Sequence, residues 1–347
     1  MTAAIVILNW NGEAYLRQFL PVLIEKTTIP GVQIIVADNA STDNSLTLLQ
    51  NEFPTIRTIV LDKNYGFAGG YNKALYQVDA DYYVLLNSDV EVTDNWLEPM
   101  LAYMDQHEDV AACQPKISSF NNRNKFEHAG AAGGFIDKFG FPFCRGRVFG
   151  VVEEDKGQYD NIVDVFWASG ACMLVRSKAY WKVGGLDDDF FAHMEEIDLC
   201  WRFKSRAYRV VCIPESTVYH IGGGTLKVEN PHKTYLNFRN NLLMLYKNLP
   251  NHLLKKTMFW RFVFDYSAAL QLFITGKPQN AVSVFKARKD YKLMLPNFVE
   301  KRKENILYST IVNHNEIFQK SIVLEYYIKQ KKTFCKYKII TCLQSAI

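Results

Sequence analysis

The sequence lacks several features that would place it in other protein classes. It contains no run of 18 uncharged apolar residues, so no transmembrane helix is predicted. Its seven cysteines form no CxxC pair and are odd in number. The first residues enter a strand-like segment and show neither the basic nor the apolar region of a signal peptide. We therefore expect a cytoplasmic protein with reduced, mostly buried thiols.

Charge is divided unevenly along the 347 residues. From Lys227 onward there are 21 Lys and Arg against 7 Asp and Glu, whereas the first 226 residues hold 19 and 29. The length allows one large domain and a smaller appendage. An acidic front and a basic tail predict that these two parts have separate tasks.

Short apolar runs alternate with helical patterns early in the chain. Strands are predicted at 3–8, 33–37, 56–61 and 82–86, and helical patterns follow the first three of them. This alternation predicts an α/β fold with a mostly parallel sheet and helices on both faces. Residues 117–162 show no period and are predicted to be loop-rich. Regular structure returns at 163–175, with helices at 177–183 and 195–206 and a strand at 208–213, and the pattern is helical from about residue 232.

Polar side chains gather where the predicted strands end. These residues are Asn9, Asp38, Asn39, Asn64, Asn87, Ser88 and Asp89. Ligands of such sheets bind beyond the carboxyl ends of the strands. Asp38 could accept hydrogen bonds from a ribose or a base, or it could belong to a helix cap. Asp89 could hold Mg²⁺ or Mn²⁺ together with phosphate oxygens, or it could lie in a polar turn.

Three carboxylates, Glu195, Glu196 and Asp198, follow an aromatic pair at 190–191. A carboxylate near other carboxylates has a raised pKa, which suits a general base. The alternative is an acidic first turn of a helix, favoured by the helix dipole.

Two histidines are candidates for contact with a metal ion. His220 precedes three glycines at 222–224, whose flexibility would let it close onto the ion. His193 lies near the carboxylates and competes with it. A structural or surface role is the alternative for either histidine.

The order and spacing of seven blocks resemble family 2 inverting glycosyltransferases of the GT-A fold, above all the bacterial rhamnosyltransferase-like branch. The blocks are IVILNWNG (5–12), VADNASTDNS (36–45), NYGFAGGYN (64–72), LLNSDVEV (85–92), WASGACMLVRSKAYWKVGGLDDDFF (167–191), MEEIDLCWR (194–202) and VYHIGGGT (218–225). They cover about residues 3–250. The resemblance implies a GT-A nucleotide-diphospho-sugar transferase fold, followed by C-terminal helices.

The resemblance implies a donor role for residues at the strand ends. Asp38 would contact the nucleoside, with Asn9 and Asn39 on the donor side as well. Asn64 and Gly66 would lie in a loop that lines the donor pocket.

The resemblance also implies where the metal and the base lie. Asp89 matches the last Asp of the metal motif, and His220 falls where several relatives use a His toward the metal. Glu196 falls at the position of the catalytic base. Two departures matter. The metal motif begins with Asn87 in place of the usual Asp, and the base is a Glu, so Glu195 and Asp198 stay alternative bases.

The resemblance implies transfer of a sugar from a nucleotide-diphosphate donor to an acceptor hydroxyl with inversion. The donor would be dTDP-rhamnose or a UDP- or GDP-sugar. The acceptor would be a glycan or a lipid-linked glycan in cell-surface polysaccharide biosynthesis, and the cofactor Mn²⁺ or Mg²⁺. Trp167 and Ser169 are candidates for holding the acceptor, although Trp167 could equally be a core residue.

Two other functions compete with sugar transfer. A nucleotide-binding oxidoreductase would need a GxGxxG turn after the first strand, and residues 9–12 read NWNG instead. A non-catalytic nucleotide-sugar-binding subunit of a glycan assembly complex is the remaining alternative.

We expect a catalytic domain over 1–230, with about 1–115 for the nucleotide sugar and 116–230 for the acceptor. The remainder, 231–347, is predicted to be helical and basic. Within 257–275 the polar side chains gather on one side of a helix, Arg261 and Asp265 are spaced to pair, and lysines flank the segment. Such a helix suits an anionic membrane surface, here the inner face of a bacterial plasma membrane. Packing on the catalytic domain or in a homodimer is the alternative, and no nucleic-acid partner is expected.

Overall fold

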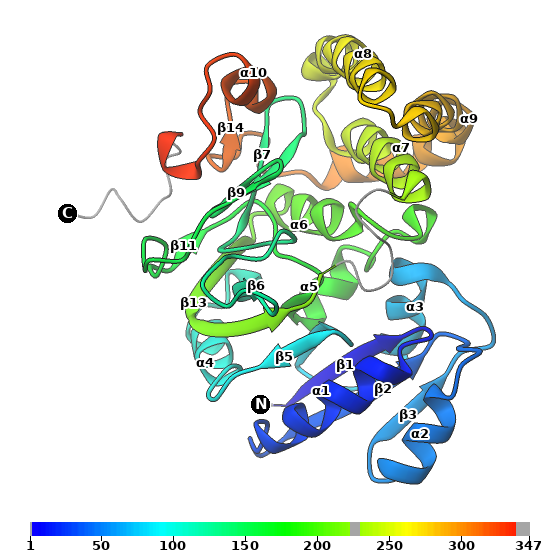
Figure 1. Cartoon of the computed structure of the whole chain (residues 1–347), viewed down its shortest axis with the longest axis vertical. Helices are drawn as coiled ribbons and strands as arrows, with labels where there is room; N and C mark the ends of the chain where they lie inside the picture. The colour runs from blue at the N-terminus through cyan, green and yellow to red at the C-terminus, as the bar shows by residue number, and fades with distance from the viewer. Residues whose placement is uncertain (1, 223–229, 338–347) are drawn as a thin grey trace.

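The computed structural model describes residues 2–222 and 230–337. A central sheet with helices on both sides forms the lower part of the molecule in Figure 1. A small second sheet and a group of long helices lie above it. No helix in the described ranges has the length and apolar character needed to cross a membrane.

The first half of the central sheet is parallel, as the sequence predicts. In spatial order its strands are β3 (Arg57–Val60), β2 (Val32–Asp38), β1 (Ala3–Asn9) and β4 (Tyr82–Asn87). The connecting helices are α1 (Glu13–Glu25), α2 (Ser45–Glu52) and α3 (Gly66–Leu75). Asn9 pairs with Asp38, and Leu8 pairs with Asn87. The polar ends of three strands therefore meet at one edge of the sheet.

The second half of the sheet is mixed. The chain adds β5 (Val90–Val92), α4 (Glu98–Gln106), β6 (Val110–Ser119), β11 (Val163–Asp164), β12 (Cys172–Arg176) and β13 (Arg209–His220). The order is β11-β13-β6-β12-β4-β1-β2-β3, with β12 antiparallel to β4 and β6. The strand predicted at 208–213 continues past an irregularity between Ile213 and Thr217. Its extension pairs His220 with Val90 of β5, next to Asp89.

One helix precedes the acidic cluster in the sequence, and a second helix contains it. They are α5 (Ser177–Lys182) and α6 (Glu195–Ser205), which confirm the helices predicted at 177–183 and 195–206. A short 3-10 turn, η1 (Asp188–Phe190), lies between them. The acidic cluster therefore begins α6.

The segment predicted to be loop-rich contains short strands. They are β7 (Gly134–Asp137), β8 (Pro142–Cys144), β9 (Arg147–Val148) and β10 (Val151–Val152). Most of the segment lies outside strands and helices, as predicted, and its strands of two to four residues are too short to show a period in the sequence. The small sheet is completed by β14 (Ile317–Phe318), which pairs in parallel with β7.

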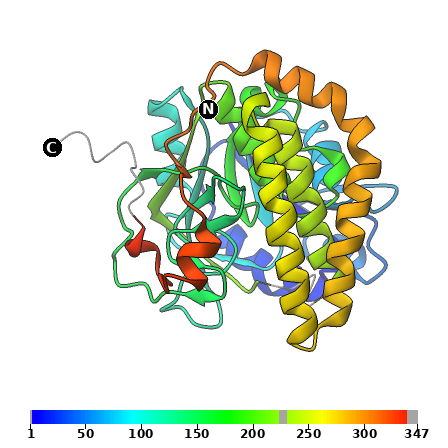
Figure 2. The same ribbon diagram turned by 90° about the horizontal axis from the view of Figure 1, so that it is seen from above.

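Three long helices follow the central sheet. They are α7 (Pro231–Asn248), α8 (Asn251–Ile274) and α9 (Pro278–Tyr308), so the predicted helical region is confirmed as far as Tyr308. Beyond it come β14, α10 (Ile322–Tyr327) and the 3-10 turn η2 (Phe334–Lys336), so this part is not wholly helical. Figures 1 and 2 show these three helices grouped together, with α8 at the top of the molecule in Figure 1.

Candidate active site

The ends of β1 and β2 are joined by buried polar side chains. Asn9 donates from Nδ2 to Asp38 Oδ1 at 3.1 Å, and the Ser41 amide donates to Asp38 Oδ2 at 2.9 Å. Asn9 and Asp38 are both fully buried. The Oδ1 atom of Asn9 has no hydrogen-bond partner, which leaves an acceptor available at this edge.

A second group of bonds shapes the loop before α3. Asn39 donates from Nδ2 to Asn64 Oδ1 at 3.1 Å and to the Gly66 carbonyl at 3.0 Å. The Gly66 amide donates to Asn64 Oδ1 at 2.8 Å. Gly66 has a φ of +71° and lies against Phe191, so a side chain at this position would be strained and would collide with that ring.

This loop is tied to the segment that leads into α6. The amides of Phe67 and Ala68 both donate to the Phe191 carbonyl, at 2.6 and 3.2 Å. Phe191 lies four residues before Glu195, the first residue of α6. The predicted donor loop and the predicted catalytic cluster are therefore neighbours in space.

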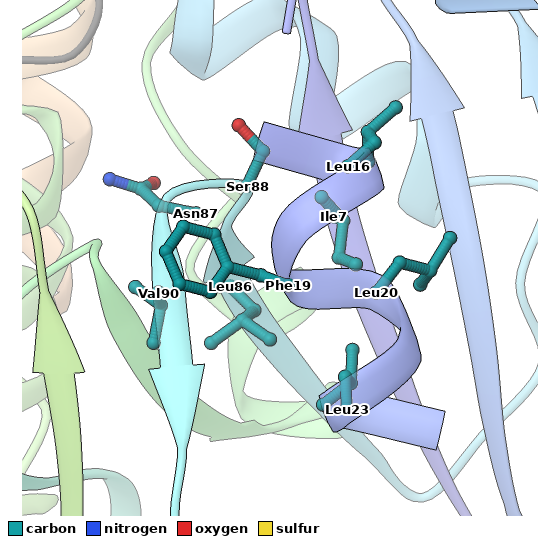
Figure 3. A pocket seen from close by; sticks show the side chains of 9 residues that line it. All are labelled: Ile7, Leu16, Phe19, Leu20, Leu23, Leu86, Asn87, Ser88 and Val90. Atoms are coloured by element: carbon teal, nitrogen blue, oxygen red, sulfur yellow. The ribbon is translucent and has the colours of Figure 1, made fainter. Parts of the chain in front are cut away.

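The end of β4 carries the predicted metal motif. Figure 3 shows Asn87 and Ser88 at one end of a small gap, with their polar groups pointing away from the apolar side chains of α1. The gap is about 10 Å³, the size of roughly one water molecule. It lies beneath the motif and is too small for a nucleotide.

His220 lies between two carboxylates. Its Nε2 is 3.1 Å from Asp89 Oδ1, and its Nδ1 is 3.4 Å from Glu127 Oε2, although this second contact lacks hydrogen-bond geometry. The amide of Asn87 is 3.5 Å from Nε2. Burial would lower the pKa of His220, but the two facing carboxylates raise it to about 10. Gly222 lies against Glu127, so a side chain there would collide with the carboxylate.

The residues predicted to hold a metal are close together. Asp89 supplies a carboxylate, the kind of ligand that suits Mn²⁺ or Mg²⁺ when phosphate oxygens complete the shell, and His220 would join it through Nε2 once that nitrogen has lost its proton. Across residues 2–222 and 230–337, no group of three or more His, Cys, Asp or Glu side chains is arranged to hold a metal. Two protein ligands therefore fit an ion that is bound together with its nucleotide. The glycines at 223 and 224 lie outside the described residues.

The three clustered carboxylates have different surroundings. Glu196 is partly exposed, while its Oε2 atom is buried and has no hydrogen-bond partner. Burial raises the pKa of Glu196 to about 7, although backbone amides at the start of α6 oppose it. Burial, and then the charge of Glu196, raises the pKa of Glu195 well above its usual value.

Asp198 is fully buried and is engaged in ion pairs. It accepts from Arg202 Nε at 2.8 Å, from Lys247 Nζ at 2.9 Å and from Asn248 Nδ2 at 2.7 Å. Burial acts to raise the pKa of Asp198, but Lys247 and Arg202 outweigh it and lower the pKa below its usual value. This carboxylate joins α6 to α7, and both of its oxygens are occupied.

Helix α7 also supports the segment before α6. Asn240 donates to the carbonyls of Phe190, Ala192 and His193 at 2.9, 2.8 and 2.7 Å. Arg239 donates to the Phe190 carbonyl as well, at 3.1 Å. Burial lowers the pKa of His193 to about 4, and its Nε2 has no partner. The helix thus fixes the backbone that leads to Glu195.

A sequence profile described as Glycosyl transferase family 2 matches residues 4–184, just over half of the chain. The chain belongs to glycosyl transferase family 2. This family 2 glycosyltransferase is similar to the N-acetylglucosaminyl-diphospho-decaprenol L-rhamnosyltransferase of Mycobacterium tuberculosis. The two are 25% identical over 232 residues, which cover 62% of this chain and 75% of that protein. The expected resemblance to the rhamnosyltransferase-like branch is confirmed.

The family 2 glycosyltransferase also resembles solved structures. GalNAc-T7, crystallised with UDP, GalNAc and Mn²⁺, has a TM-score of 0.58 at 15% identity. That match covers 84% of this chain and 54% of GalNAc-T7, so the chain spans about half of that structure. TarS 1–349 of S. aureus in complex with UDP has a TM-score of 0.53 at 16% identity, with 89% of each chain covered. The predicted GT-A fold is thereby confirmed.

The two residues predicted to hold the acceptor lie inside the glycosyltransferase. Trp167 is 4% exposed, donates from Nε1 to the Phe135 carbonyl at 3.0 Å and packs on Gly134. Ser169 is 3% exposed and donates to the Ala129 carbonyl at 2.7 Å. For Trp167 this is the core role that the sequence left open, and both side chains support the backbone near the site.

Glu127 and Asn240 carry no signal in the sequence. Glu127 comes from the aperiodic segment, and Asn240 belongs to a helix without any matched motif. The contact of Asp198 with Arg202 follows an i, i+4 spacing that can be read from the sequence. The partner Lys247 lies 49 positions away and cannot be found in this manner.

Proposed function

We propose that this glycosyltransferase uses Glu196 as a general base in a single inverting displacement. The observation that carries the proposal is the position of Glu196. Its carboxyl group has a pKa of about 7, and the residue lies in the first turn of α6, whose preceding loop is bonded to the predicted donor loop. A base works best when its pKa is close to the working pH.

The reaction needs one proton transfer and one substitution. Glu196 takes the proton of an acceptor hydroxyl, and that oxygen forms a bond to the anomeric carbon of the donor sugar. The bond from this carbon to the diphosphate oxygen breaks, and the nucleoside diphosphate leaves from the opposite face. The configuration of the carbon is inverted. Asp198 is unsuited to the proton transfer because its oxygens already accept from Arg202, Lys247 and Asn248.

Asp89 and His220 are the residues that we propose for a divalent metal. A bound Mn²⁺ or Mg²⁺ would neutralise the charge that develops on the departing diphosphate. Asp38, Asn39 and the loop at Asn64 would hold the nucleoside and sugar. The Mn²⁺ that was crystallised with GalNAc-T7 supports a metal of this kind.

The donor and acceptor are inferred from the relatives. The N-acetylglucosaminyl-diphospho-decaprenol L-rhamnosyltransferase of M. tuberculosis supports a rhamnose donor and a lipid-linked glycan acceptor. We take dTDP-rhamnose as the first donor to test, with UDP- or GDP-sugars next. Such a reaction belongs to cell-surface polysaccharide biosynthesis at the cytoplasmic face of the membrane.

A binding and turnover experiment tests the proposal. Calorimetry with dTDP, UDP and GDP in the presence of Mn²⁺ identifies the nucleotide, and hydrolysis of the matching sugar donor measures turnover. Glu196→Gln should bind the donor and lose turnover, and Glu195→Gln is the matched control. Donor binding without turnover by the wild-type protein, in the presence of metal and candidate acceptors, would favour the non-catalytic subunit instead.

A further inference from the structure

Helix α8 presents its polar side to the protein and its apolar side to solvent. Its buried residues are Thr257, Arg261, Asp265 and Ala269. An ordinary surface helix has the opposite arrangement, with an apolar stripe facing the core. The polar stripe found in the sequence therefore packs against the rest of the protein.

The buried stripe is held by a charged network. Arg261 donates to Asp265 at 3.0 Å and to the Phe139 carbonyl at 3.2 Å, and it also bonds Asn241 of α7. Arg288 of α9 donates to the second oxygen of Asp265 at 2.5 Å. A buried carboxylate with two guanidinium partners fixes the rotation of a helix about its axis, since any rotation would leave charges unpaired. The outward direction of the apolar side is thus set by the fold.

The outward side of α8 forms an apolar surface with a high exposed fraction. Its members are Leu253, Phe259, Trp260, Phe262, Val263, Leu270, Phe273 and Ile274, exposed by 37 to 73%. Val282 and Phe285 of α9 extend this surface, and the Phe285 ring lies 5.2 Å from that of Tyr266. A contiguous surface of this kind marks a site of association. We call these ten residues the apolar platform.

Exposed lysines share the two helices with the apolar platform. They are Lys255 and Lys256 on α8, and Lys289 and Lys292 on α9, while the Lys286 ammonium lies over the Tyr235 ring of α7. Asp265 is the one acidic residue of α8, and it is buried against two arginines. The outward side of α8 therefore carries no carboxylate. A bilayer with anionic headgroups complements an apolar surface that is accompanied by basic residues.

We propose that the apolar platform lies in the interface of an anionic lipid bilayer, parallel to its plane. Trp260 and Tyr266 have the amphipathic rings that are enriched at the headgroup level. The attachment that we propose is peripheral, along the outward side of α8. The proposal concerns attachment and stands independently of the donor and the base proposed above.

Hydrogen bonds through α7 connect α8 to the loop before the proposed base. Arg261 of α8 bonds Asn241, and the adjacent Asn240 holds the carbonyls of Phe190 and Ala192 before α6. Arg261, the neighbour of Trp260 in the platform, is thus linked through two adjacent asparagines of α7 to the loop that precedes the proposed base.

The test is flotation of the full chain with lipid vesicles. One set of vesicles contains phosphatidylcholine with about 30% phosphatidylglycerol, and the other contains phosphatidylcholine alone. The protein should float with the anionic vesicles at low salt, and Leu270→Glu/Phe273→Glu should lower the bound fraction at least about tenfold. Val60→Glu is the matched control, because Val60 is 60% exposed on edge strand β3 and should bind like wild type. Circular dichroism and nucleotide binding check that each variant is folded.

A second measurement locates the contact. Brominated lipid should quench the tryptophan fluorescence of the wild-type protein, and Trp260→Phe should remove most of that quenching. A full chain that stays unbound at low salt, or a double variant that floats like wild type, would overturn the proposal. A dimer that dissociates in the double variant, with no binding to vesicles, would assign the platform to a second copy of this chain.

Discussion

Glu196→Gln is expected to abolish sugar transfer and to leave donor binding intact. Loss of a general base costs about 10²- to 10⁴-fold in rate. In the wild-type protein the rate should rise with pH as Glu196 loses its proton, with a midpoint at about pH 7. Transfer is measured by chromatography of the released nucleotide, and donor binding by calorimetry.

The same variant should be more stable than the wild type at high pH. The folded protein keeps the Glu196 proton up to about pH 7, whereas the unfolded chain releases it above 4.5. Wild-type protein therefore loses stability as the pH rises through this window, and a neutral Gln does not. The rise from 4.5 to about 7 corresponds to a gain for the variant of up to about 3 kcal/mol in the free energy of unfolding.

Urea denaturation, followed by circular dichroism below pH 5 and above pH 7, measures this gain. The two proteins should have similar free energies of unfolding at the lower pH and should diverge at the higher one. Glu195→Gln should show a gain of the same sign, because burial raises the pKa of Glu195 well above its usual value. The control is Glu108→Gln, which changes an exposed carboxylate. A gain that is equal at both pH values, or an active Glu196→Gln beside an inactive Asp198→Asn, would refute the reasoning.

Three further substitutions probe the rest of the site. Asp89→Ala should remove the part of nucleotide binding that EDTA removes from the wild type. A variant that binds as tightly as the wild type with metal, and still loses that binding when EDTA is added, would contradict a metal role for Asp89. His220→Ala should weaken metal-assisted donor binding in calorimetry, while thermal denaturation shows that the variant is still folded. An unchanged affinity would show that His220 does not belong to the site. Asp198→Asn should lower the free energy of unfolding by about 3–5 kcal/mol in urea denaturation, because Lys247 and Arg202 lose a buried partner. An Asp198→Asn protein as stable as wild type would argue against its structural role.

The meeting of polar side chains at one edge of the sheet was predictable because long strands end in polar residues. Asn9 and Asp38 each end a buried strand. Parallel pairing of neighbouring strands brings such ends together irrespective of the conformation of the connecting loops. The buried ion pairing of Asp198, which distinguishes it from Glu195 and Glu196, was not predictable in full. It depends on Lys247, which reaches Asp198 from a helix far along the chain.

The orientation of α8 shows a similar limit. The polar stripe and the pairing of Arg261 with Asp265 can be predicted from the sequence, and the pairing is confirmed at 3.0 Å. Which side faces the protein depends on Arg288 and on the Phe139 carbonyl, two groups without a sequence signal. A helical projection alone does not show which side of a helix faces the protein and which faces solvent.

The pairing of β14 with β7 has a consequence for the order in which the protein folds. Ile317 and Ile136 are partners in this ladder although about 180 residues separate them, so the contact closes a very long loop. Until the chain has passed through α9, the backbone amides and carbonyls along that edge of β7 lack β14 as their partner. An open strand edge is a template for pairing with another chain. Synthesis that stalls after α9 would therefore leave an aggregation-prone intermediate, and the late arrival of β14 protects the small sheet that β7 begins.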